Sequence, residues 1–164
     1  MIGRGLRLVP LLVILLPAAL RAASTEVNTC GQAVSGNAHL AANLDCTGFA
    51  GDAVTLNGGT FDLRGFTLTG GQANGVKCTD SCTVRSDPAG GTITGSQGDG
   101  VLLSLFGAVL QIEDVSITGN TLNGVEGPVT GVVKVFRATV MGNGQSGVLA
   151  HARRVRVDGS TLSN

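Results

Sequence analysis

The residues of this chain that could do chemistry lie mainly in its C-terminal half. Glu113 and Asp114 are adjacent, and glycoside cleavage uses two carboxyl groups, one as the acid and one as the base or nucleophile. Arg153, Arg154 and Arg156 are close in sequence, and guanidinium groups bind carboxylates such as those of uronic acids. The alternative interpretation of both groups, which the sequence favours, is ordinary solvated surface charge.

The chain offers little for a metal or a cofactor. His39 and His151 are its 2 histidines, and with Met141 they do not form a repeated set of soft ligands, which disfavours a copper-accessory role. The sequence contains no Ser-His-acid arrangement, glycine-rich phosphate loop or zinc signature. We therefore expect neither a metal site nor a cofactor.

The 4 cysteines are Cys30, Cys46, Cys78 and Cys82. Three pairings are possible in principle, and proximity in sequence favours Cys30 with Cys46 and Cys78 with Cys82. The spacing does not form two CxxC pairs, so disulfides are a better interpretation than a metal site. All four cysteines lie in the part of the chain that we expect to be exported, and the oxidising environment there lets disulfides persist.

The N-terminus predicts this export. Arg4 and Arg7 precede an apolar run at 8–20, and small residues follow it, which is typical of a secretory signal peptide. The run is shorter than the roughly 20 residues that span a bilayer, so we expect no membrane span in the mature chain. We assign 1–23 to the signal peptide and expect a secreted or periplasmic protein that starts near Ser24.

The composition excludes several classes of protein. Of 164 residues, 43% are apolar and 13% are charged, which fits neither a disordered tail nor a coiled coil. The 11 basic residues balance 11 acidic ones, but Arg4, Arg7 and Arg21 lie in the predicted signal peptide. The remainder has 8 basic and 11 acidic groups, so it lacks the basic surface typical of proteins that bind nucleic acid.

Two apolar series recur along the chain with nearly the same period. The first follows a small residue at each step, at intervals of 22, 25, 24 and 23: Val54, Val76, Val101, Val125 and Val148. The second runs at 25, 24, 23 and 22, and glycine follows two residues after each of its first four members: Leu68, Ile93, Ile117, Val140 and Leu162. A fixed period of this length is the signature of a repeat architecture.

Apolar residues alternate within each repeat, which is the period of a β-strand. Each repeat offers three short strands, and the middle one is marked by these inward residues: Leu63, Ile112, Val135 and Val157. The two-residue steps to the third strand, such as Glu113-Asp114, are too short for a crossover helix. The chain must keep winding, which predicts an all-β, single-stranded parallel β-helix of about five coils of 22–25 residues.

Polar residues recur in the same period. Hydroxyl side chains are expected to stack outward on the third strand: Thr67, Thr92, Ser116, Thr139 and Thr161. Residue types that favour turns precede each Ala-Val or Gly-Val step: Asp52, Asn74, Asp99, Asn123 and Ser146. We interpret the second set as a turn ladder and not as a calcium site, because Asn74 separates Asp52 from Asp99 and no carboxylates cluster in sequence.

The middle strands predict one candidate binding surface. Gln111, Lys134 and Arg156 fall at equivalent outward positions of successive coils and would form a basic strip. Such a strip could bind an acidic polysaccharide or a cell-surface glycan. The loops after the third strands are about one turn long, so we expect no deep cleft from them.

Four stretches resemble the bacterial right-handed parallel β-helix proteins of the pectin-lyase-like superfamily: CGQAVSGNAHLAANLDCTG from Cys30, FDLRGFTLTGG from Phe61, VSITGNTLNGV and ATVMGNGQSGV. The resemblance covers essentially the whole mature chain and implies a right-handed coil. It also implies a disulfide-containing N-terminal cap at 24–50, followed by repeats at 51–164. Because Asn164 falls where the next repeat glycine would be, we expect an N-terminal fragment truncated within a coil.

The resemblance is specific for a fold and leaves the function open, because the same scaffold carries polysaccharide lyases and hydrolases, adhesins and accessory proteins of copper enzymes. The first hypothesis is an exported solenoid with a structural, glycan-binding or surface-binding role and no catalytic site. The alternative is the N-terminal part of a polysaccharide lyase or glycoside hydrolase that acts on acidic polysaccharide. We favour the first, and Glu113, Asp114 and Arg156 are the catalytic candidates of the second.

Overall fold

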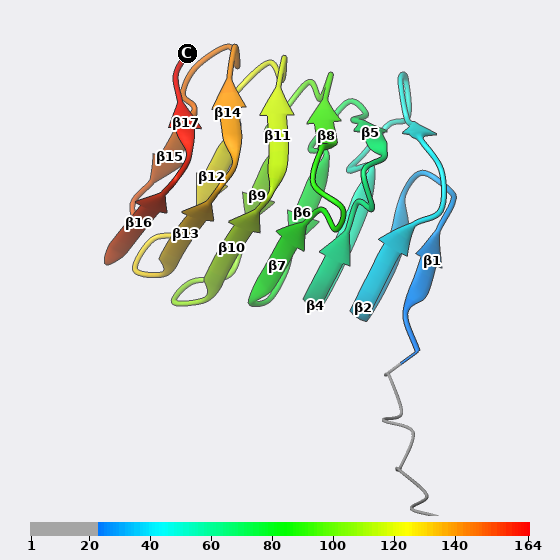
Figure 1. Ribbon diagram of the computed structural model, residues 1–164, viewed down its shortest axis with the longest axis horizontal. Helices are drawn as coiled ribbons and strands as arrows, with labels where there is room; N and C mark the ends of the chain where they lie inside the picture. The colour runs from blue at the N-terminus through cyan, green and yellow to red at the C-terminus, as the bar shows by residue number, and fades with distance from the viewer. Residues whose placement is uncertain (1–22) are drawn as a thin grey trace, which may run out of the picture.

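A computed structural model describes residues 23–164, and every regular element in this range is a β-strand. The strands wind as a parallel solenoid of about 6 turns, each stacked on the turn before it (Figure 1). The predicted fold class, an all-β parallel β-helix, is therefore confirmed.

Three ladders of parallel strands run along the solenoid. The N-terminal halves of β2 (Gln32–Leu40) and β4 (Val54–Asp62) begin the first ladder. This ladder continues through β6 (Val76–Cys78), β9 (Val101–Leu103), β12 (Val125–Gly127) and β15 (Val148–Ala150). The C-terminal halves of β2 and β4 begin the second ladder, which continues through β7 (Cys82–Arg85), β10 (Val109–Glu113), β13 (Val132–Phe136) and β16 (Arg154–Asp158). The third contains β3 (Leu44–Asp45), β5 (Thr67–Thr69), β8 (Gly91–Thr94), β11 (Val115–Thr118), β14 (Thr139–Met141) and β17 (Thr161–Leu162).

Both predicted apolar series form core ladders. In the first ladder, Val54 pairs in register with Val76, and Val76 pairs with Val101. In the third ladder, Leu68 pairs with Ile93, and the series continues to Leu162. These five side chains, of Val54, Val76, Val101, Leu68 and Ile93, are fully buried. Burying one such side chain contributes roughly 1.5–3 kcal/mol. The stack of equivalent side chains is thus the main source of stability.

The middle ladder differs from the prediction in its second turn. Its inward residues are Phe61, Val84, Ile112, Val135 and Val157. The assignment of Leu63 to this position was wrong, because Leu63 follows the end of β4 and is buried at the next corner. In this turn no loop separates the first ladder from the second, because the continuous strand β4 belongs to both. The middle-strand residues therefore occur earlier in the sequence than the repeat spacing suggests.

Single residues in the left-handed region turn the chain from the second ladder to the third. Asp114, Arg137 and Gly159 occupy equivalent corners, with φ angles of 57°, 46° and 57°. The sequence predicted a two-residue corner, but Glu113 and Phe136 belong to strands β10 and β13 and pair with each other. The strands of the second ladder therefore reach one residue further than the end predicted for two of the corners: two residues, 137–138 and 159–160, still separate these strands from the third ladder, whereas Asp114 alone separates β10 from β11.

The first turn comes from the segment that was predicted to be a cap. Within 24–50, β2 pairs with β4 and β3 pairs with β5, all in parallel. This segment therefore adds a turn to the predicted five and gives about 6 in total. A further strand, β1 (Thr25–Val27), pairs with the end of β2.

The predicted turn ladder is a chain of side-chain hydrogen bonds between turns. Asn74 donates to Asp52 Oδ1 through its backbone N at 3.2 Å and through Nδ2 at 2.7 Å. Asn123 donates to Asp99 Oδ1 in the same way, at 2.9 Å in both bonds. Each carboxylate thus fixes the turn of the following coil, which is the structural role predicted for this series.

Both predicted disulfides are present. Cys30 bonds to Cys46 and joins the beginning of the first turn to its end. Cys78 bonds to Cys82 and closes the corner between β6 and β7. The cysteine pairs therefore tie local segments within single turns.

The predicted signal peptide at 1–23 lies outside the described residues except for Ala23. From Ala23 to Asn164 the chain forms no helix with the length and apolar character needed to cross a membrane.

Candidate functional site

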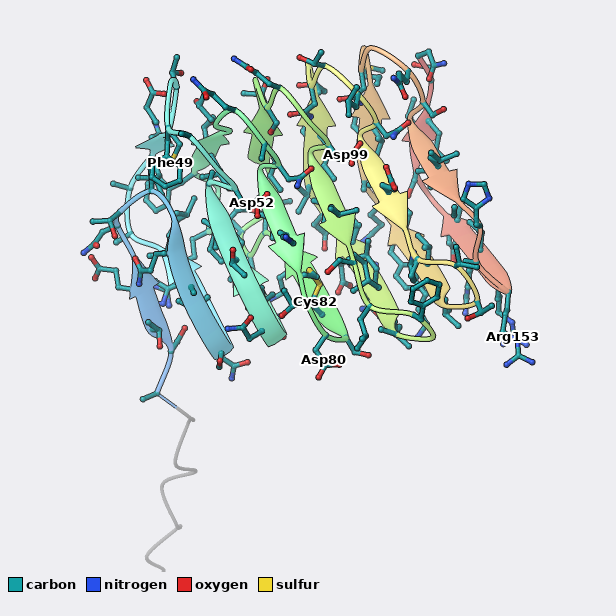
Figure 2. The ribbon with its side chains drawn as sticks, turned by 180° about the vertical axis from the view of Figure 1, so that it is seen from behind. Phe49, Asp52, Asp80, Cys82, Asp99 and Arg153 are labelled. Carbon is teal, nitrogen blue, oxygen red and sulfur yellow. A yellow bond between two sulfur atoms is a disulfide. The ribbon has the colours of Figure 1, made fainter. Side chains whose placement is uncertain are left out.

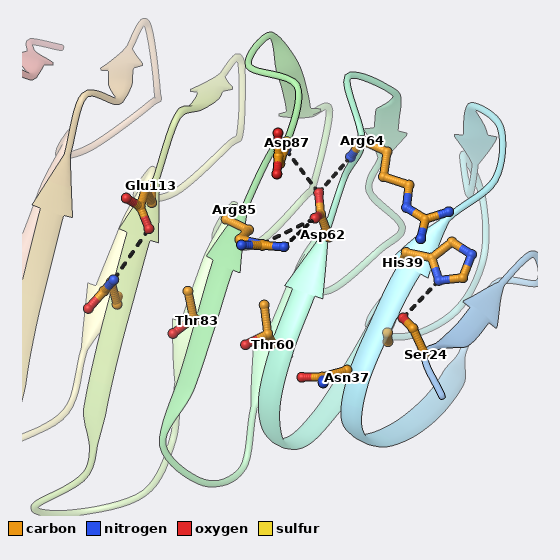
Figure 3. A pocket seen from close by; sticks show the side chains of 12 residues that line it. Ser24, Asn37, His39, Thr60, Asp62, Arg64, Thr83, Arg85, Asp87 and Glu113 are labelled. Carbon is orange, nitrogen blue, oxygen red and sulfur yellow. Dashed lines mark hydrogen bonds and ion pairs between the residues drawn. The ribbon is translucent and has the colours of Figure 1, made fainter. Parts of the chain in front are cut away.

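The outward side of the second ladder carries a groove of about 750 Å³ (Figure 3). Strands β2, β4, β7 and β10 form its floor, and most of the side chains that line it are polar. The side chains lie in two rows that cross these strands (Figure 3). The rows follow from the parallel register, because equivalent positions of successive turns lie about 4.8 Å apart.

The first row passes from neutral hydrogen-bonding groups to two cations. Its members pair in register from turn to turn: Asn37, Thr60, Thr83, Gln111, Lys134 and Arg156. The structure therefore brings the three residues of the predicted strip together as the C-terminal half of a longer row. The groove contains the row as far as Gln111, and Lys134 and Arg156 extend the same face beyond it.

The second row begins with a histidine, after which Asp62, Arg85 and Glu113 alternate in sign. Its members also pair in register: His39, Asp62, Arg85, Glu113, Phe136 and Asp158. Figure 3 shows the first four of them beside the neutral groups of the first row. The groove is therefore lined by neutral hydrogen-bonding groups on one side and mainly by carboxylate and guanidinium groups on the other.

Asp62 is bonded on both carboxylate oxygens. Its Oδ1 accepts from the backbone N of Arg64 and from that of Asp87, both at 3.0 Å. Its Oδ2 accepts from Arg85 Nε at 3.1 Å and from Arg85 Nη2 at 3.0 Å. The side chain is buried, and its bonds hold the corner loops that form one wall of the groove. Asp62 is thus a positioning group for the groove.

The predicted carboxylate pair shares one arginine. Arg137 Nη2 donates to Glu113 Oε1 and to Asp114 Oδ2, and Arg137 Nε donates to Asp114 Oδ1 at 2.8 Å. The hydrogen bonds from Arg137 hold the pKa of Asp114 below its usual range. The acid in glycoside cleavage needs a raised pKa, so the lowered pKa of Asp114 disfavours this residue as the acid of the pair.

The C-terminal half of the face presents the cations. The guanidinium carbon of Arg156 lies over the ring of Phe136, 5.2 Å from its centroid. Arg156 Nη2 is also 3.5 Å from an oxygen of Asp158. Stacking orients a guanidinium, and Arg156 remains well exposed. Lys134 is half-buried and makes no ion pair with the described residues.

The other two arginines of the predicted cluster lie at the beginning of β16 and just before it. Arg153 precedes β16 and Arg154 is its first residue, at the corner between the first and second ladders (Figure 2). Arg154 pairs in register with Val132 and is exposed. Arg154 and Arg156 thus lie two residues apart on the outward face of β16, whereas Arg153 lies in the loop before this strand.

The histidines and Met141 are distributed over different parts of the coil. His39 lies at the rim of the groove, where its Nδ1 is 2.8 Å from Ser24 Oγ. His151 follows β15 and is exposed, whereas Met141 ends β14. Among residues 23–164, no three His, Cys, Asp or Glu side chains form a group that could hold a metal ion.

Sequence reasoning missed the N-terminal half of the groove, which includes Asn37, His39, Thr60, Asp62, Thr83, Arg85 and Asp87. The usable signal is an apolar residue between two polar ones, as in Thr60-Phe61-Asp62 and Thr83-Val84-Arg85. The same pattern surrounds Ile112 in the predicted strip. It was hidden because corner length differs between turns, so a constant repeat spacing does not align these triplets.

Comparisons of the chain with known protein families, curated proteins and solved structures found no match. Asp62, Glu113 and Asp114 each form an ion pair with an arginine, and the rows offer hydrogen bonds along an open, elongated face.

Proposed function

We propose that this chain is an exported parallel β-solenoid that binds an acidic glycan along the outward face of its second ladder, without a catalytic site. The observation that carries this proposal is the first row, in which neutral groups lead in register to Lys134 and Arg156. Hydroxyl groups of sugars need the donors and acceptors that Asn, Thr and Gln supply. Carboxylates of uronic acids pair with lysine and arginine.

The spacing of the turns supports an extended chain as the ligand. Successive turns repeat at about 4.8 Å, which is close to the length of one pyranose unit in an extended polysaccharide. Successive sugars can therefore meet equivalent positions of the row on successive turns. An elongated glycan uses the whole row, whereas a compact ligand would contact only two or three of its members.

The proposed location is the periplasm or the cell exterior. The disulfides support it, because such bonds persist in oxidising compartments, and the predicted signal peptide at 1–23 would direct the export. The repeats and the parallel coil also support membership of the pectin-lyase-like superfamily, which we include in the proposal.

Binding to an immobilised polyuronate tests the function. The double variant Lys134→Ala/Arg156→Ala is expected to bind at least about tenfold more weakly. A hydrogen bond to a charged group contributes roughly 1.5–3 kcal/mol of binding free energy, and salt reduces this contribution at an exposed site. Lys77→Ala is the matched control, because Lys77 lies on the first ladder and pairs with Asp52. Equal binding by the wild type and the double variant would contradict the proposal.

The alternative, part of a polysaccharide lyase or glycoside hydrolase, is distinguished by its products. The protein is incubated with a polyuronate, and unsaturated products are followed by absorbance while new reducing ends are measured chemically. We expect neither signal. Turnover that Glu113→Gln or Arg156→Ala abolishes would replace the binding proposal by the enzymatic one.

A further inference from the structure

A second surface lies at the corner where each turn passes from the first ladder to the second. The corner loops of four successive turns stack along one edge of the solenoid, which we call the loop edge: 79–81, 104–108, 128–131 and 151–153. Backbone hydrogen bonds join neighbouring loops; Thr130 N, for example, donates to His151 O at 3.2 Å. Asp80 and Arg153 mark the two ends of the loop edge in Figure 2.

The middle of the loop edge exposes large apolar side chains. Phe106 is 72% exposed, Val129 is 46% exposed and Leu105 is 42% exposed. The backbone N of Gly107 donates to Val129 O at 3.5 Å, so the two loops are direct neighbours. Neighbouring exposed apolar side chains of this size are typical of an interaction surface.

The loops that carry these side chains are fixed by the coil. Gly107 and Thr130 have φ angles of 74° and 66°, and a threonine in the left-handed region is uncommon. Val132 N donates to Ala108 O at 3.0 Å, which ties the base of one loop to the base of the next. The apolar tips are therefore presented by an ordered scaffold, and little conformational entropy is lost when they bind.

Basic side chains adjoin the apolar tips on one side. Arg153 N donates to Gly131 O at 2.9 Å, which places Arg153 directly beside the loop of Val129. Arg153 and Arg154 are exposed and form no ion pair with the described residues. The opposing charge on this edge is Asp80. It lies at the far end of the loop edge from the arginines, on the other side of the loop that carries Phe106.

We infer that the loop edge docks on a lipid bilayer with anionic headgroups. Phe106, Leu105 and Val129 would enter the acyl boundary, and the arginines would contact the headgroup phosphates. Apolar tips flanked by basic groups are the combination that binds such interfaces. This surface is distinct from the glycan-binding face, because it lies on the loops that precede the second ladder and Leu105 and Val129 offer a sugar neither hydrogen bonds nor stacking. Asp80 would tilt the solenoid so that its C-terminal turns approach the bilayer.

A single tryptophan reports docking locally. The chain contains 0 Trp and 0 Tyr, so the full-length variant Phe106→Trp has one indole, at the tip of the loop edge. We expect its emission to shift to the blue, and to be quenched by brominated acyl chains, with vesicles that contain phosphatidylglycerol. Phosphatidylcholine vesicles should give a much smaller effect. Adding Arg153→Ala/Arg154→Ala should weaken the response at least about tenfold.

The matched control is Phe49→Trp. Phe49 is also a partly exposed aromatic residue, at 37%, and it lies on the opposite side of the molecule in Figure 2. Its emission should not respond, which separates the loop edge from any lipid binding by the apolar segment at 8–20. An unchanged Phe106→Trp spectrum, or an equal response to neutral vesicles, would overturn the inference. A blue shift of the Phe106→Trp emission with a protein extract but not with vesicles would overturn the inference in favour of a protein interface.

Discussion

Glu126 shows how a single carboxyl group can oppose folding in this coil. Burial is the largest cause that raises its pKa above the ordinary value of 4.5, followed by repulsion from Asp99 and a hydrogen bond with Asp99. A hydrogen bond from Asn123 Nδ2, at 3.2 Å, and the charge of His151 act in the opposite direction. Because the folded state holds the proton more tightly than the unfolded state, ionisation of Glu126 destabilises the fold.

We predict that Glu126→Gln stabilises the protein at pH 7. The amide keeps an oxygen for Asn123 Nδ2 and removes the charge that Asp99 repels. The gain should be below about 1 kcal/mol, because water screens a group this accessible. It should be constant at neutral pH, decrease as the pH falls through the raised pKa of Glu126, and vanish below 4.5, where the carboxyl is protonated in both states.

Urea unfolding followed by far-ultraviolet circular dichroism at several pH values measures this effect, since the chain contains 0 Trp and 0 Tyr for a fluorescence assay. Glu26→Gln changes the net charge equally at an exposed position on β1 and serves as the control. A gain that persists unchanged below pH 4 would show that the substitution acts through packing and not through charge.

Asp114 is the contrasting residue, because hydrogen bonds from Arg137 lower its pKa. Sequence alone predicted that the Glu113-Asp114 pair is surface charge, but it could not identify the partner. Arg137 lies one full turn later, and only the parallel register places it beside both carboxylates. Residue chemistry in a solenoid therefore depends on the register of neighbouring turns.

At the scale of strands, the bend of β2 over β4 depends on two paired glycines. Gly36 and Gly59 face each other after a register shift, with φ angles of 77° and 101°. A Cβ on Gly59 would overlap the carbonyl oxygen of Gly36, whereas a Cβ on Gly36 would meet no atom within 4 Å. The two positions therefore share backbone strain but differ in the available space.

We predict that Gly59→Ala costs about 3 kcal/mol or more of unfolding free energy, because it combines backbone strain with overlap between two backbones. Gly36→Ala is the matched control and should cost roughly 1–2 kcal/mol, the penalty of the left-handed conformation alone. Urea midpoints of the two variants measure the difference. Equal losses would mean that the strands move apart at this bend without much cost.

The elements themselves were largely predictable, because alternation and period are local properties of the sequence. The first and third ladders follow directly from the Val54 and Leu68 series. The second ladder could not be derived from a constant period in this way. Within a repeat, a short corner on one side of the middle strand is compensated by a longer corner on the other side, so the position of this strand varies while the period stays nearly constant. Leu63 was misassigned for this reason, and half of the groove was missed with it.

A buried ladder of asparagines was also missed. Asn120 Nδ2 donates to Asn143 Oδ1 at 3.0 Å, and Asn120 Oδ1 accepts from Ser96 N at 3.0 Å. Both asparagines are buried. In sequence they resemble ordinary loop residues after the repeat glycines, because nothing local distinguishes an inward amide from a solvated one. Their spacing by one repeat is the signal that could have identified them.

The whole molecule separates stability from recognition. Its interior is a stack of equivalent apolar side chains, whereas the proposed glycan-binding face and the loop edge lie on the outside of the same coils. A solenoid can therefore change an outward residue without repacking its core, since each turn contacts mainly its neighbours. This organisation also predicts that the cost of a core substitution depends on how many turns cover it.

The middle ladder allows a direct test of that dependence. Val135 is 0% exposed between two neighbouring turns, whereas Val157, at the equivalent inward position of the next turn, is 42% exposed. Val135→Ala should cost about 2 kcal/mol, because it removes buried methyl groups and leaves a cavity. Val157→Ala makes the same chemical change and should cost less than half as much, because water already reaches that side chain. Urea unfolding of both variants measures the ratio, and equal costs would mean that the sixth turn is covered in solution.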